Sequence, residues 1–321
     1  MTSLQVIITD CDHENIEIEE SVFEQAQVSF ELKDCMTEQE VIDNCKGAMV
    51  LLNQYAPITE KVMAQLPELK LVVRYGVGVN NVDVEAATKR GIQVCNVPDY
   101  GMHEVADHAL ALMLALTRKI TVMNDHVKNG SWNYQRSIPI FRHSEQVVGI
   151  IGLGRIGTAF AHKVHSLGCK VVAYDPNKIR DSEKYIPDFV EMVDFESLLK
   201  MSDVVSIHCP LESANNLIDA SAMEKMKSTA YLINVSRGGI INEKDLNQFL
   251  QENRIAGAAL DVFMIEPLGK GSPLIQHENF LCTPHMAWYS EQSAVELKRK
   301  VAEEAARFLA KEQVKYPVNQ F

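Results

Sequence analysis

The stretch that decides the fold reads VVGIIGLGRIGTAFAHKVHSLGCKVVAYD and spans residues 147–175. It opens with a continuous apolar run, Val147–Ile151, which is typical of a strand buried in a parallel sheet. Glycines follow closely, and Thr158–Leu167 then has the apolar spacing of an amphipathic helix. A second apolar run, Lys170–Tyr174, ends in Asp175. The order strand, glycine loop, helix, strand predicts a parallel βαβ unit.

The glycine loop indicates that this unit binds a dinucleotide. Gly152 allows the tight turn, Gly154 lets the backbone approach a pyrophosphate, and Gly157 lets the helix pack closely on the strand. The N-terminus of the helix offers free N–H groups to the phosphates. The other loop residues, Arg155 and Ile156, are therefore expected at the cofactor as well.

Asp175 at the end of the second strand predicts which dinucleotide is bound. Its carboxylate can accept hydrogen bonds from the ribose hydroxyls and would repel a 2′-phosphate, so we expect NAD rather than NADP. A GxGxxG pattern alone also occurs in purely structural turns. Here the strand, the helix and the acidic residue stand in register, and the combination favours the dinucleotide.

Outside this unit, short apolar runs alternate with amphipathic segments, as in a parallel α/β protein. In the first hundred residues the expected strands are Gln5–Thr9, Ala48–Leu52, Leu71–Val73 and Gln93–Cys95. The expected helices are Glu38–Asn44, Glu60–Ala64 and Val84–Lys89. These elements predict one complete small α/β domain.

The chain changes character after this first domain. Met102–Lys119 is apolar at nearly every turn, which predicts a helix buried between domains or against a second subunit. An irregular stretch with several aromatic residues, 129–144, follows, and a second α/β block runs over 146–284. The tail, Ser290–Lys311, has the spacing of a helix with one buried face.

Composition excludes several classes of function. The 321 residues carry a net charge of −12 without a basic cluster, which argues against binding to nucleic acid or to an anionic membrane. The seven cysteines are scattered and odd in number, without a metal-ligand spacing, so we expect free thiols in a reducing cytoplasm and no metal. The N-terminus has no secretory leader pattern, and no apolar run is long enough to span a bilayer.

Three residues after strands of the second block could perform carbonyl chemistry. Arg237 follows an apolar strand that begins at Tyr231, and its guanidinium could bind a carboxylate through two hydrogen bonds. Glu266 and His285 also follow strands, and if they pair, the carboxylate stabilises the imidazolium as a proton donor. Taken singly, each of the three also fits a surface salt bridge or a capping residue.

Five motifs together resemble one family. NVSRGG, ALDVFMIEP and TPHMAW carry Arg237, Glu266 and His285, while RYGVGVNNVD and GLGRIG lie upstream. The motifs and their order are similar to those of the D-isomer-specific 2-hydroxyacid dehydrogenases. The resemblance implies two Rossmann-like α/β domains, with an NAD-binding domain (102–287) inserted into a flavodoxin-like substrate domain (1–101 and 288–321). It also implies reversible hydride transfer between NADH and a 2-oxo acid.

The resemblance further implies roles for individual residues. Arg237 would hold the 2-oxo acid, His285 would be the acid and base, and Glu266 would be its partner. Asp261 would meet the nicotinamide carboxamide. The remaining cofactor contacts would come from the strand ends at Cys209, Pro210, Val235 and Ser236. The substrate contacts would come from the backbone of Val77 and Gly78 and from Asn53, Arg74 and Trp288.

Two branches of the family resemble the chain most. Phosphoglycerate dehydrogenases usually carry a basic residue in the loop after the third strand, but here Asn53 and its neighbours offer no cation, so phosphoglycerate is the second choice. The segment around Trp288 is closer to the dehydrogenase-like C-terminal-binding-protein corepressors. If Trp288 borders the pocket, an apolar side chain on the oxo acid is favoured, and the alternative is a hinge or core aromatic residue.

Two further interpretations stay open. A rival from another class is an NADH-sensing oligomeric binding protein of corepressor type with little turnover. For either function, the family resemblance implies a homodimer through the 102–144 region. One motif is dismissed: the sequence HEVADH, from His103 to His108, looks like the HExxH motif of zinc proteases but has the wrong spacing. Its histidines are five residues apart and face different sides of a helix, so we expect them in a helix packed near the cofactor or a dimer partner.

Overall fold

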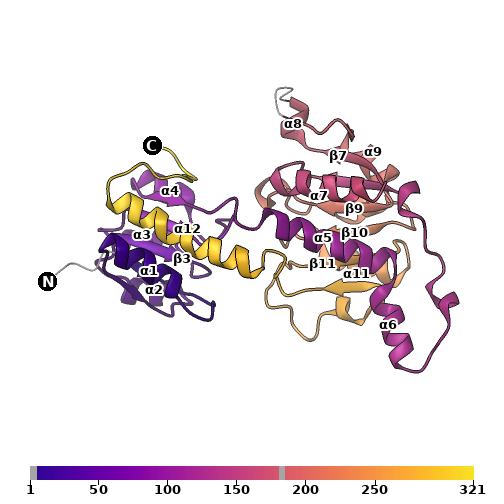
Figure 1. The fold of residues 1–321 in the computed structure, drawn as a ribbon, viewed down its shortest axis with the longest axis horizontal. Helices are drawn as coiled ribbons and strands as arrows, with labels where there is room; N and C mark the ends of the chain where they lie inside the picture. Colours follow the sequence, from indigo (N-terminus) through magenta and orange to yellow (C-terminus); the bar gives the residue numbers. More distant parts are fainter. Residues whose placement is uncertain (1–5, 181–184) are drawn as a thin grey trace. The chain divides into compact units, whose positions relative to one another are not determined.

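The computed structural model describes residues 6–180 and 185–321, and they form two compact units (Figure 1). Within the described residues, one unit combines residues 6–101 with 290–321, and the other comprises residues 102–180 with 185–289. Each unit is built on a parallel sheet with helices on both faces, so the predicted α/β class and the inserted arrangement are confirmed.

The first unit has a five-stranded sheet in the order β2-β1-β3-β4-β5, which is the flavodoxin-like order. Its strands are β1 (Val6–Ile8), β2 (Phe30–Leu32), β3 (Val50–Asn53), β4 (Leu71–Arg74) and β5 (Gln93–Cys95). Its helices are α1 (Glu17–Ala26), α2 (Glu38–Asn44), α3 (Glu60–Gln65), α4 (Val84–Lys89) and α12 (Glu291–Leu309). The central strands are buried on both faces, which explains why they read as continuous apolar runs.

The two faces of this sheet are covered by different helices. Side chains of α2, α3 and α4 form one hydrophobic cluster with alternate residues of the strands, such as Ile7 and Leu51. On the other side, α12 contacts β3 and β4 and packs along α1 (Figure 1). Ser290 caps α12 through a reciprocal pair with Ser293, so the last helix begins where the chain returns to this unit.

The second unit has a seven-stranded sheet in the order β12-β11-β10-β9-β6-β7-β8. Its strands are β6 (Val147–Ile151), β7 (Lys170–Tyr174), β8 (Val190–Met192), β9 (Val204–Ile207), β10 (Tyr231–Asn234), β11 (Gly257–Leu260) and β12 (Phe280–Cys282). Its α-helices are α5 (Met102–Thr117), α6 (Ile120–Lys128), α7 (Arg155–Ser166), α8 (Pro176–Arg180), α9 (Phe195–Met201), α10 (Ala220–Met223) and α11 (Glu243–Gln251). Short 3₁₀ turns lie at η1 (Tyr134–Ser137), η2 (His143–Glu145), η3 (Leu211–Ser213) and η4 (Pro273–Gln276).

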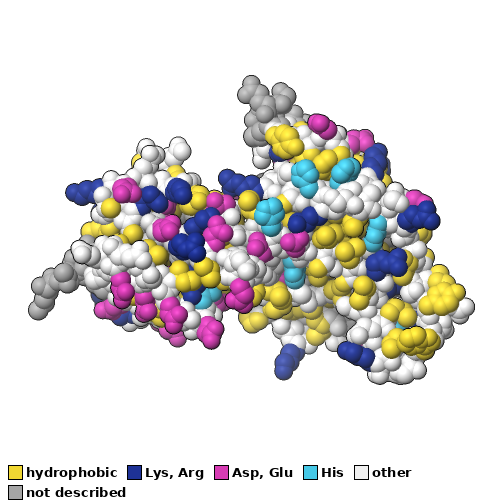
Figure 2. Space-filling model, viewed as in Figure 1, with side chains coloured by type: hydrophobic (Ala, Val, Ile, Leu, Met, Phe, Trp, Pro, Cys, Tyr) yellow, Lys and Arg dark blue, Asp and Glu magenta, His cyan; other side chains and the backbone are white. Residues whose placement is uncertain are grey.

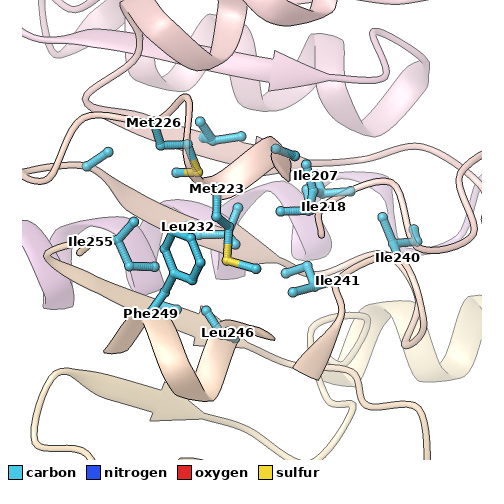
Figure 3. Close-up of a cluster of buried hydrophobic side chains, with 14 of the residues drawn as sticks. Ile207, Ile218, Met223, Met226, Leu232, Ile240, Ile241, Leu246, Phe249 and Ile255 are labelled. Atoms are coloured by element: carbon cyan, nitrogen blue, oxygen red, sulfur yellow. The ribbon is translucent and has the colours of Figure 1, made fainter. Parts of the chain in front are cut away.

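Two hydrophobic clusters sandwich the second sheet. The cluster of Figure 3 joins strand residues such as Ile207 and Leu232 to Met223, Leu246 and Phe249 from the helices on that face. On the opposite face, α5 packs on α7 and contacts β10 and β11. The apolar side chains that predicted a buried α5 are thus covered largely within this one unit.

Several predicted boundaries differ from the structure. Helix α7 begins at Arg155 rather than Thr158, because the turn of the glycine loop itself starts the helix. The apolar run Ala258–Phe263 predicts a strand, but β11 ends at Leu260. Helix α5 ends at Thr117, shortly before Lys119 takes a left-handed backbone conformation. The expected list also omitted β2, whose residues are partly exposed, and α1. Gln5, expected to open the first strand, lies outside the described residues.

Among the helices of the described residues, none has the length and apolar character needed to cross a membrane.

Candidate NAD-binding and catalytic site

The glycine loop lies where the strand order of the second sheet reverses direction. Strand β6 is flanked by β7 on one side and β9 on the other, and ligands of doubly wound sheets bind at such a switch point. Gly152 follows β6 with φ of +91°, a conformation that favours glycine. A Cβ at Gly152 would lie 2.7 Å from the backbone nitrogen of Cys209, which follows β9. The two strand ends therefore meet so closely that only glycine fits.

The other two glycines of the loop, Gly154 and Gly157, have different structural roles. A Cβ at Gly157 would lie 2.1 Å from the carbonyl oxygen of Gly152, so this glycine lets α7 pack against the loop. A Cβ at Gly154 would meet no atom within 4 Å. Since Gly154 is also the residue before the first turn of α7, the space beside it is open toward the helix N-terminus, where a pyrophosphate would be held.

Asp175 lies beside this loop at the end of β7. Its Oδ2 accepts a hydrogen bond from the backbone N–H of Leu153 at 3.0 Å, and its Oδ1 accepts from the N–H of Asn177 at 2.9 Å. The carboxylate is therefore oriented by the backbone on both sides. It stands where an acidic residue binds the ribose of a dinucleotide in this fold.

The turn after β9 lies against the glycine loop at Gly152. The Ser236 hydroxyl donates a hydrogen bond to the carbonyl oxygen of Cys209, which ties this turn to the end of β10. Val235 is buried next to Ser236, and Pro210 is exposed. Burial lowers the pKa of His208, and its Nε2 pairs with the hydroxyl of Ser206 at 2.9 Å. Sequence reasoning did not single out His208, because a histidine inside an apolar run carries no distinctive pattern.

Arg237 lies in a turn that its neighbours shape closely. The Asn234 side chain spans the turn, accepting from the N–H of Ser236 at 3.0 Å and donating to the carbonyl oxygen of Arg237 at 2.8 Å. A Cβ at Gly238 would lie 1.9 Å from the carbonyl oxygen of Phe263, so glycine lets the turn approach the segment after β11. The guanidinium Nη1 donates to the carbonyl oxygen of Ser236 at 2.7 Å.

Glu266 and His285 form a pair. His285 Nδ1 lies 2.7 Å from Glu266 Oε2, and Glu266 Oε1 accepts from the backbone N–H of Phe263 at 2.8 Å. Burial raises the pKa of Glu266, but the hydrogen bonds from His285 and Phe263 and the charge of Arg237 outweigh it and lower the pKa overall. Both side chains remain 36–39% exposed. Because Nδ1 faces Glu266, Nε2 is the nitrogen through which the ring could exchange a proton with a ligand.

Asp261 is buried at the end of β11 and orders the loop that carries His285. Its Oδ1 accepts from the N–H of Met286 at 3.0 Å, and its Oδ2 accepts from the N–H of Ala287 at 2.9 Å. It also accepts from the hydroxyl of Thr283 at 2.5 Å, and that hydroxyl lies 2.9 Å from His108 Nε2. Thr283 was not predicted as a site residue. His108 was predicted only as part of a packed helix, which it is.

The predicted substrate residues of the first unit lie at the carboxyl ends of β3 and β4. Arg74 ends β4, and its guanidinium fills the space where a Cβ of Gly76 would be. Val77 is exposed, and its carbonyl oxygen accepts from the side chain of Asn96 at 2.6 Å. Gly78 follows in the same turn.

Asn53 is placed differently from a ligand-binding residue. Its side chain is fully buried, with Nδ2 donating to the carbonyl oxygen of Ala56 at 2.8 Å and Oδ1 accepting from Asn81 at 2.6 Å. Both ends of the amide are used within the protein, so Asn53 orders the turn. The exposed side chain of that turn is Tyr55, whose hydroxyl donates to Asp12 at 3.0 Å.

Trp288 lies in the loop after His285, partly buried, with its ring perpendicular to that of Tyr289 at 5.5 Å. No group of three or more His, Cys, Asp or Glu side chains within residues 6–180 and 185–321 is arranged to hold a metal ion. The open space beside Gly154 at the N-terminus of α7 and the oriented carboxylate of Asp175, in contrast, fit a dinucleotide.

Comparison with known proteins agrees with this geometry. The NAD-binding-domain profile of the D-isomer-specific 2-hydroxyacid dehydrogenases matches residues 110–287. The chain is 37% identical over 273 residues to glyoxylate reductase from Korarchaeum cryptofilum, an alignment that covers 84% of this chain and 81% of the reductase. It is 37% identical over 306 residues to D-3-phosphoglycerate dehydrogenase from Synechocystis, covering 94% of this chain but 54% of that protein. The chain thus spans about half the length of this second relative.

A crystal structure of a protein from Thermus thermophilus superposes with a TM-score of 0.88 at 27% identity, covering 98% of this chain and all of that one. The glycine loop, the doubly wound sheet and these matches define an NAD-binding oxidoreductase. The chain belongs to the D-isomer-specific 2-hydroxyacid dehydrogenase family, whose members are NAD-dependent enzymes acting on CH–OH groups. The predicted family, fold and cofactor are confirmed.

Proposed function

We propose that the protein is an NAD-dependent D-2-hydroxyacid dehydrogenase that interconverts a 2-oxo acid and its D-2-hydroxy acid. The observation that carries the proposal is the Glu266–His285 pair, in which a half-exposed imidazole is held by a carboxylate at 2.7 Å. Arg237 contributes to the low pKa of the same carboxylate, so the three groups form one electrostatic cluster.

Each residue of this cluster has a distinct task. Arg237 binds the 2-oxo acid through its guanidinium and polarises the carbonyl. His285 donates a proton from Nε2 to the carbonyl oxygen during reduction and removes it during oxidation. Glu266 keeps the ring oriented and stabilises the imidazolium. NAD, when bound, supplies or accepts the hydride at C4 of the nicotinamide.

The cofactor residues are proposed from the fit of the loop. The open space beside Gly154 and the N-terminus of α7 suit the pyrophosphate, with the backbone of Arg155 and Ile156 facing it. Asp175 is proposed to bind the adenosine ribose. The turns at Cys209–Pro210 and Val235–Ser236 would flank the cofactor, and Asp261 would accept a hydrogen bond from the carboxamide.

For the substrate we propose a 2-oxo acid with an uncharged, apolar side chain. Trp288 is the aromatic surface that would contact this side chain. Val77 and Gly78 are proposed to bind the carboxylate through backbone N–H groups, with Arg74 nearby in sequence. Because the amide of Asn53 is used within the protein, Asn53 is not proposed as a direct substrate contact.

NADH oxidation measured against a panel of 2-oxo acids tests this proposal. The panel should contain glyoxylate, pyruvate, 4-methyl-2-oxopentanoate, hydroxypyruvate and 3-phosphohydroxypyruvate. Turnover with an apolar side chain in the lead supports the proposal. A clear preference for the phosphorylated acid would instead indicate a phosphoglycerate dehydrogenase. Tight NADH binding without turnover of any acid would favour a nucleotide-sensing binding protein.

We also propose that the protein is a homodimer. Large apolar side chains are exposed after α6, including Trp132, Tyr134 and Ile138, and Figure 2 shows hydrophobic side chains over this end of the second unit. A groove of about 490 Å³ on the same unit is lined in part by apolar residues. These are Leu116, Val122, Tyr231, Leu250 and Leu281. A two-fold axis would let the segment of each copy enter the groove of the other.

Sedimentation at micromolar concentration tests the dimer. The wild-type chain should sediment as a dimer, and Trp132→Ala combined with Tyr134→Ala should shift it toward the monomer. A monomeric wild type would overturn the proposal.

The unpaired thiols of the structure also fit the reducing cytoplasm that we propose as the location.

A further inference from the structure

A chain of polar contacts links α5 to the loop that carries His285. His108 on α5 lies with Nε2 2.9 Å from the hydroxyl of Thr283, and that hydroxyl lies 2.5 Å from Oδ1 of Asp261. His108 Nε2 and Asp261 Oδ1 are 3.7 Å apart, too far for a direct hydrogen bond. Thr283 is thus the bridge between the helix and the strand end.

The direction of these hydrogen bonds follows from counting protons. A carboxylate has only acceptors, so Thr283 must donate its single hydroxyl proton to Asp261. The hydroxyl oxygen can then only accept from His108, which therefore carries a proton on Nε2. The histidine is a donor at the start of a two-step relay that ends on Asp261.

Asp261 in turn holds the backbone of the loop that carries His285. Its carboxylate accepts the N–H groups of Met286 and Ala287, and its carbonyl oxygen accepts the N–H of His285 at 2.8 Å. His285 has φ of +53°, in the left-handed region that is uncommon for residues other than glycine. Three successive backbone N–H groups of the loop that carries the imidazole are therefore held by one buried residue, two by its carboxylate and one by its carbonyl oxygen.

We propose that His108 is a positioning residue of this active site: its Nε2–H orients Thr283 and Asp261, and through them the backbone of His285. The inference rests on the proposed dehydrogenase function. Asp261 is also the proposed acceptor of the nicotinamide carboxamide, so the relay serves both the proton donor and the cofactor. His108 itself does not touch the reacting atoms.

Three variants with a matched control test the role of His108. His108→Ala removes the donor, and His108→Gln restores an N–H donor at a similar reach from the helix. Thr283→Val removes the bridge and keeps its shape. His103→Ala is the control, because this histidine lies on the same helix but is exposed.

We expect His108→Ala to lower kcat about 10- to 100-fold, since misplaced catalytic groups lose about that much, with the KM of the oxo acid changed less than kcat. His108→Gln should recover most of kcat, and His103→Ala should match the wild type. The double variant of His108→Ala and Thr283→Val should be no slower than the poorer single variant, because both break one chain of contacts.

NADH affinity, measured by quenching of tryptophan fluorescence, separates this inference from the function itself. His108→Ala should weaken NADH binding about fivefold, as expected when one hydrogen bond in the relay is lost, and His108→Gln should restore it. This pattern would support the relay even if no oxo acid were turned over, in which case only the proposed activity would fail. Wild-type kcat and NADH affinity in His108→Ala, or a glutamine variant as impaired as the alanine variant, would overturn the inference. Fully additive effects of the two substitutions would overturn it as well.

Discussion

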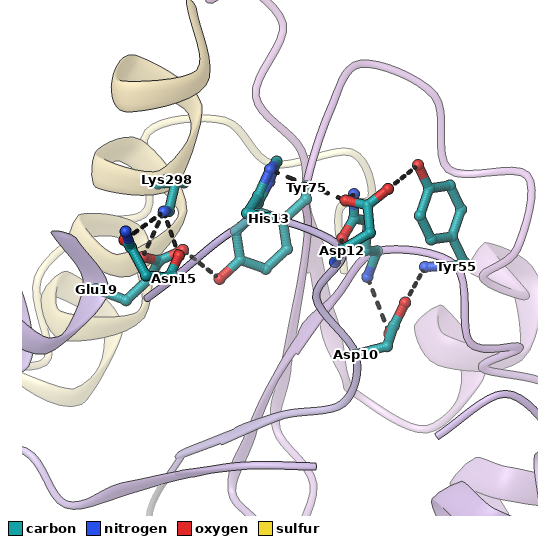
Figure 4. A network of polar contacts seen from close by, with 9 residues as sticks. Asp10, Asp12, His13, Asn15, Glu19, Tyr55, Tyr75 and Lys298 are labelled. Atoms are coloured by element: carbon teal, nitrogen blue, oxygen red, sulfur yellow. Dashed lines mark hydrogen bonds and ion pairs between the residues drawn. The ribbon is translucent and has the colours of Figure 1, made fainter. Parts of the chain in front are cut away.

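Two carboxylates, one in each unit, are held by a basic side chain in very different surroundings. Glu266 pairs with His285 at 2.7 Å in the second unit, and both side chains are 36–39% exposed. Glu19 on α1 faces Lys298 on α12 in the first unit at 3.9 Å, and these side chains are 0% and 8% exposed. Tyr75 donates to Glu19 at 3.0 Å, and Lys298 donates to the backbone of Asn15 (Figure 4).

The pKa shifts of the two acids have opposite signs. Burial raises the pKa of Glu19, and neither Lys298 nor the Tyr75 hydroxyl offsets it. Burial also raises the pKa of Glu266, but its hydrogen bonds and Arg237 outweigh this and lower it. A buried network such as that of Glu19, Tyr75 and Lys298 holds helices together. A half-open pair with one ring edge toward solvent can exchange protons with a ligand. Substitution in the Glu266–His285 pair should therefore lower activity more than stability. Substitution in the Glu19–Lys298 network should lower stability.

The largest expected effect is on activity at the second site. His285→Ala should lower kcat about 10²–10⁴-fold, because a positioned general acid contributes about that much. The free energy of unfolding should change little, since the side chain is partly exposed. Steady-state kinetics with NADH and urea unfolding measure the two quantities, with His103→Ala as the control. A loss of stability equal to the loss of activity would make His285 a structural residue.

The next effect is on stability at the first site. Lys298→Met should cost about 3–5 kcal/mol of unfolding free energy, because Glu19 is left buried without its partner. Adding Glu19→Gln should recover part of this loss. Lys200→Met is the control, since that lysine pairs with Glu196 at an exposed position and should cost about 0–1 kcal/mol. Equal losses in the two lysine variants would contradict the distinction between the networks.

A third carboxylate, that of Asp175, should affect cofactor binding rather than catalysis or stability. Asp175 is oriented by backbone N–H groups and is proposed to meet the adenosine ribose. Asp175→Ala should raise the preference for NADPH over NADH about tenfold, because the repulsion of a 2′-phosphate disappears. Dissociation constants for both reduced cofactors measure the change. An unchanged ratio would remove Asp175 from the cofactor site.

The smallest effects concern pH. Glu19 has a raised pKa in the folded state, so the fold binds its proton more readily and loses stability as pH rises above about 4.5. Glu266 has a lowered pKa, so its contribution is present above about 4.5 and is lost as pH falls through the folded-state value. Relative to the wild type, the melting temperature of Glu19→Gln should therefore rise with pH above about 4.5. That of Glu266→Gln should fall as pH rises toward about 4.5 and stay level above it. Parallel curves for both variants would show that the environments do not differ as described.

Local pattern sufficed to predict much of the second unit. The glycine loop, β6 and β7 follow from residue types in sequence order, because a tight turn at Gly152 and a close approach at Gly157 admit little else. The candidates Arg237, Glu266 and His285 were found because each follows a strand, although their order along the chain says nothing of distance. That Glu266 and His285 pair at 2.7 Å is visible only in the structure.

Other features depend on contacts between distant segments and could not be predicted locally. His108 and Thr283 are 175 residues apart, and neither residue type predicts which partner it contacts. Asn53 was assigned to the substrate because of the loop in which it lies, but the side chain turns inward to Asn81 and Ala56. The network of Glu19 and Lys298 joins the two ends of the chain, so no sequence window contains both.

The central claim is that hydride passes between NADH and C2 of a 2-oxo acid at the site of His285. The most direct measurement is transfer of label: NADH deuterated at C4 is incubated with the preferred 2-oxo acid, and the hydroxy acid is analysed by mass spectrometry and chiral chromatography. The account predicts one deuterium at C2 of the D-isomer, formed by the wild type and almost abolished in His285→Ala. A hydroxy acid without deuterium from either C4-labelled form, or equal labelling by the variant, would contradict it.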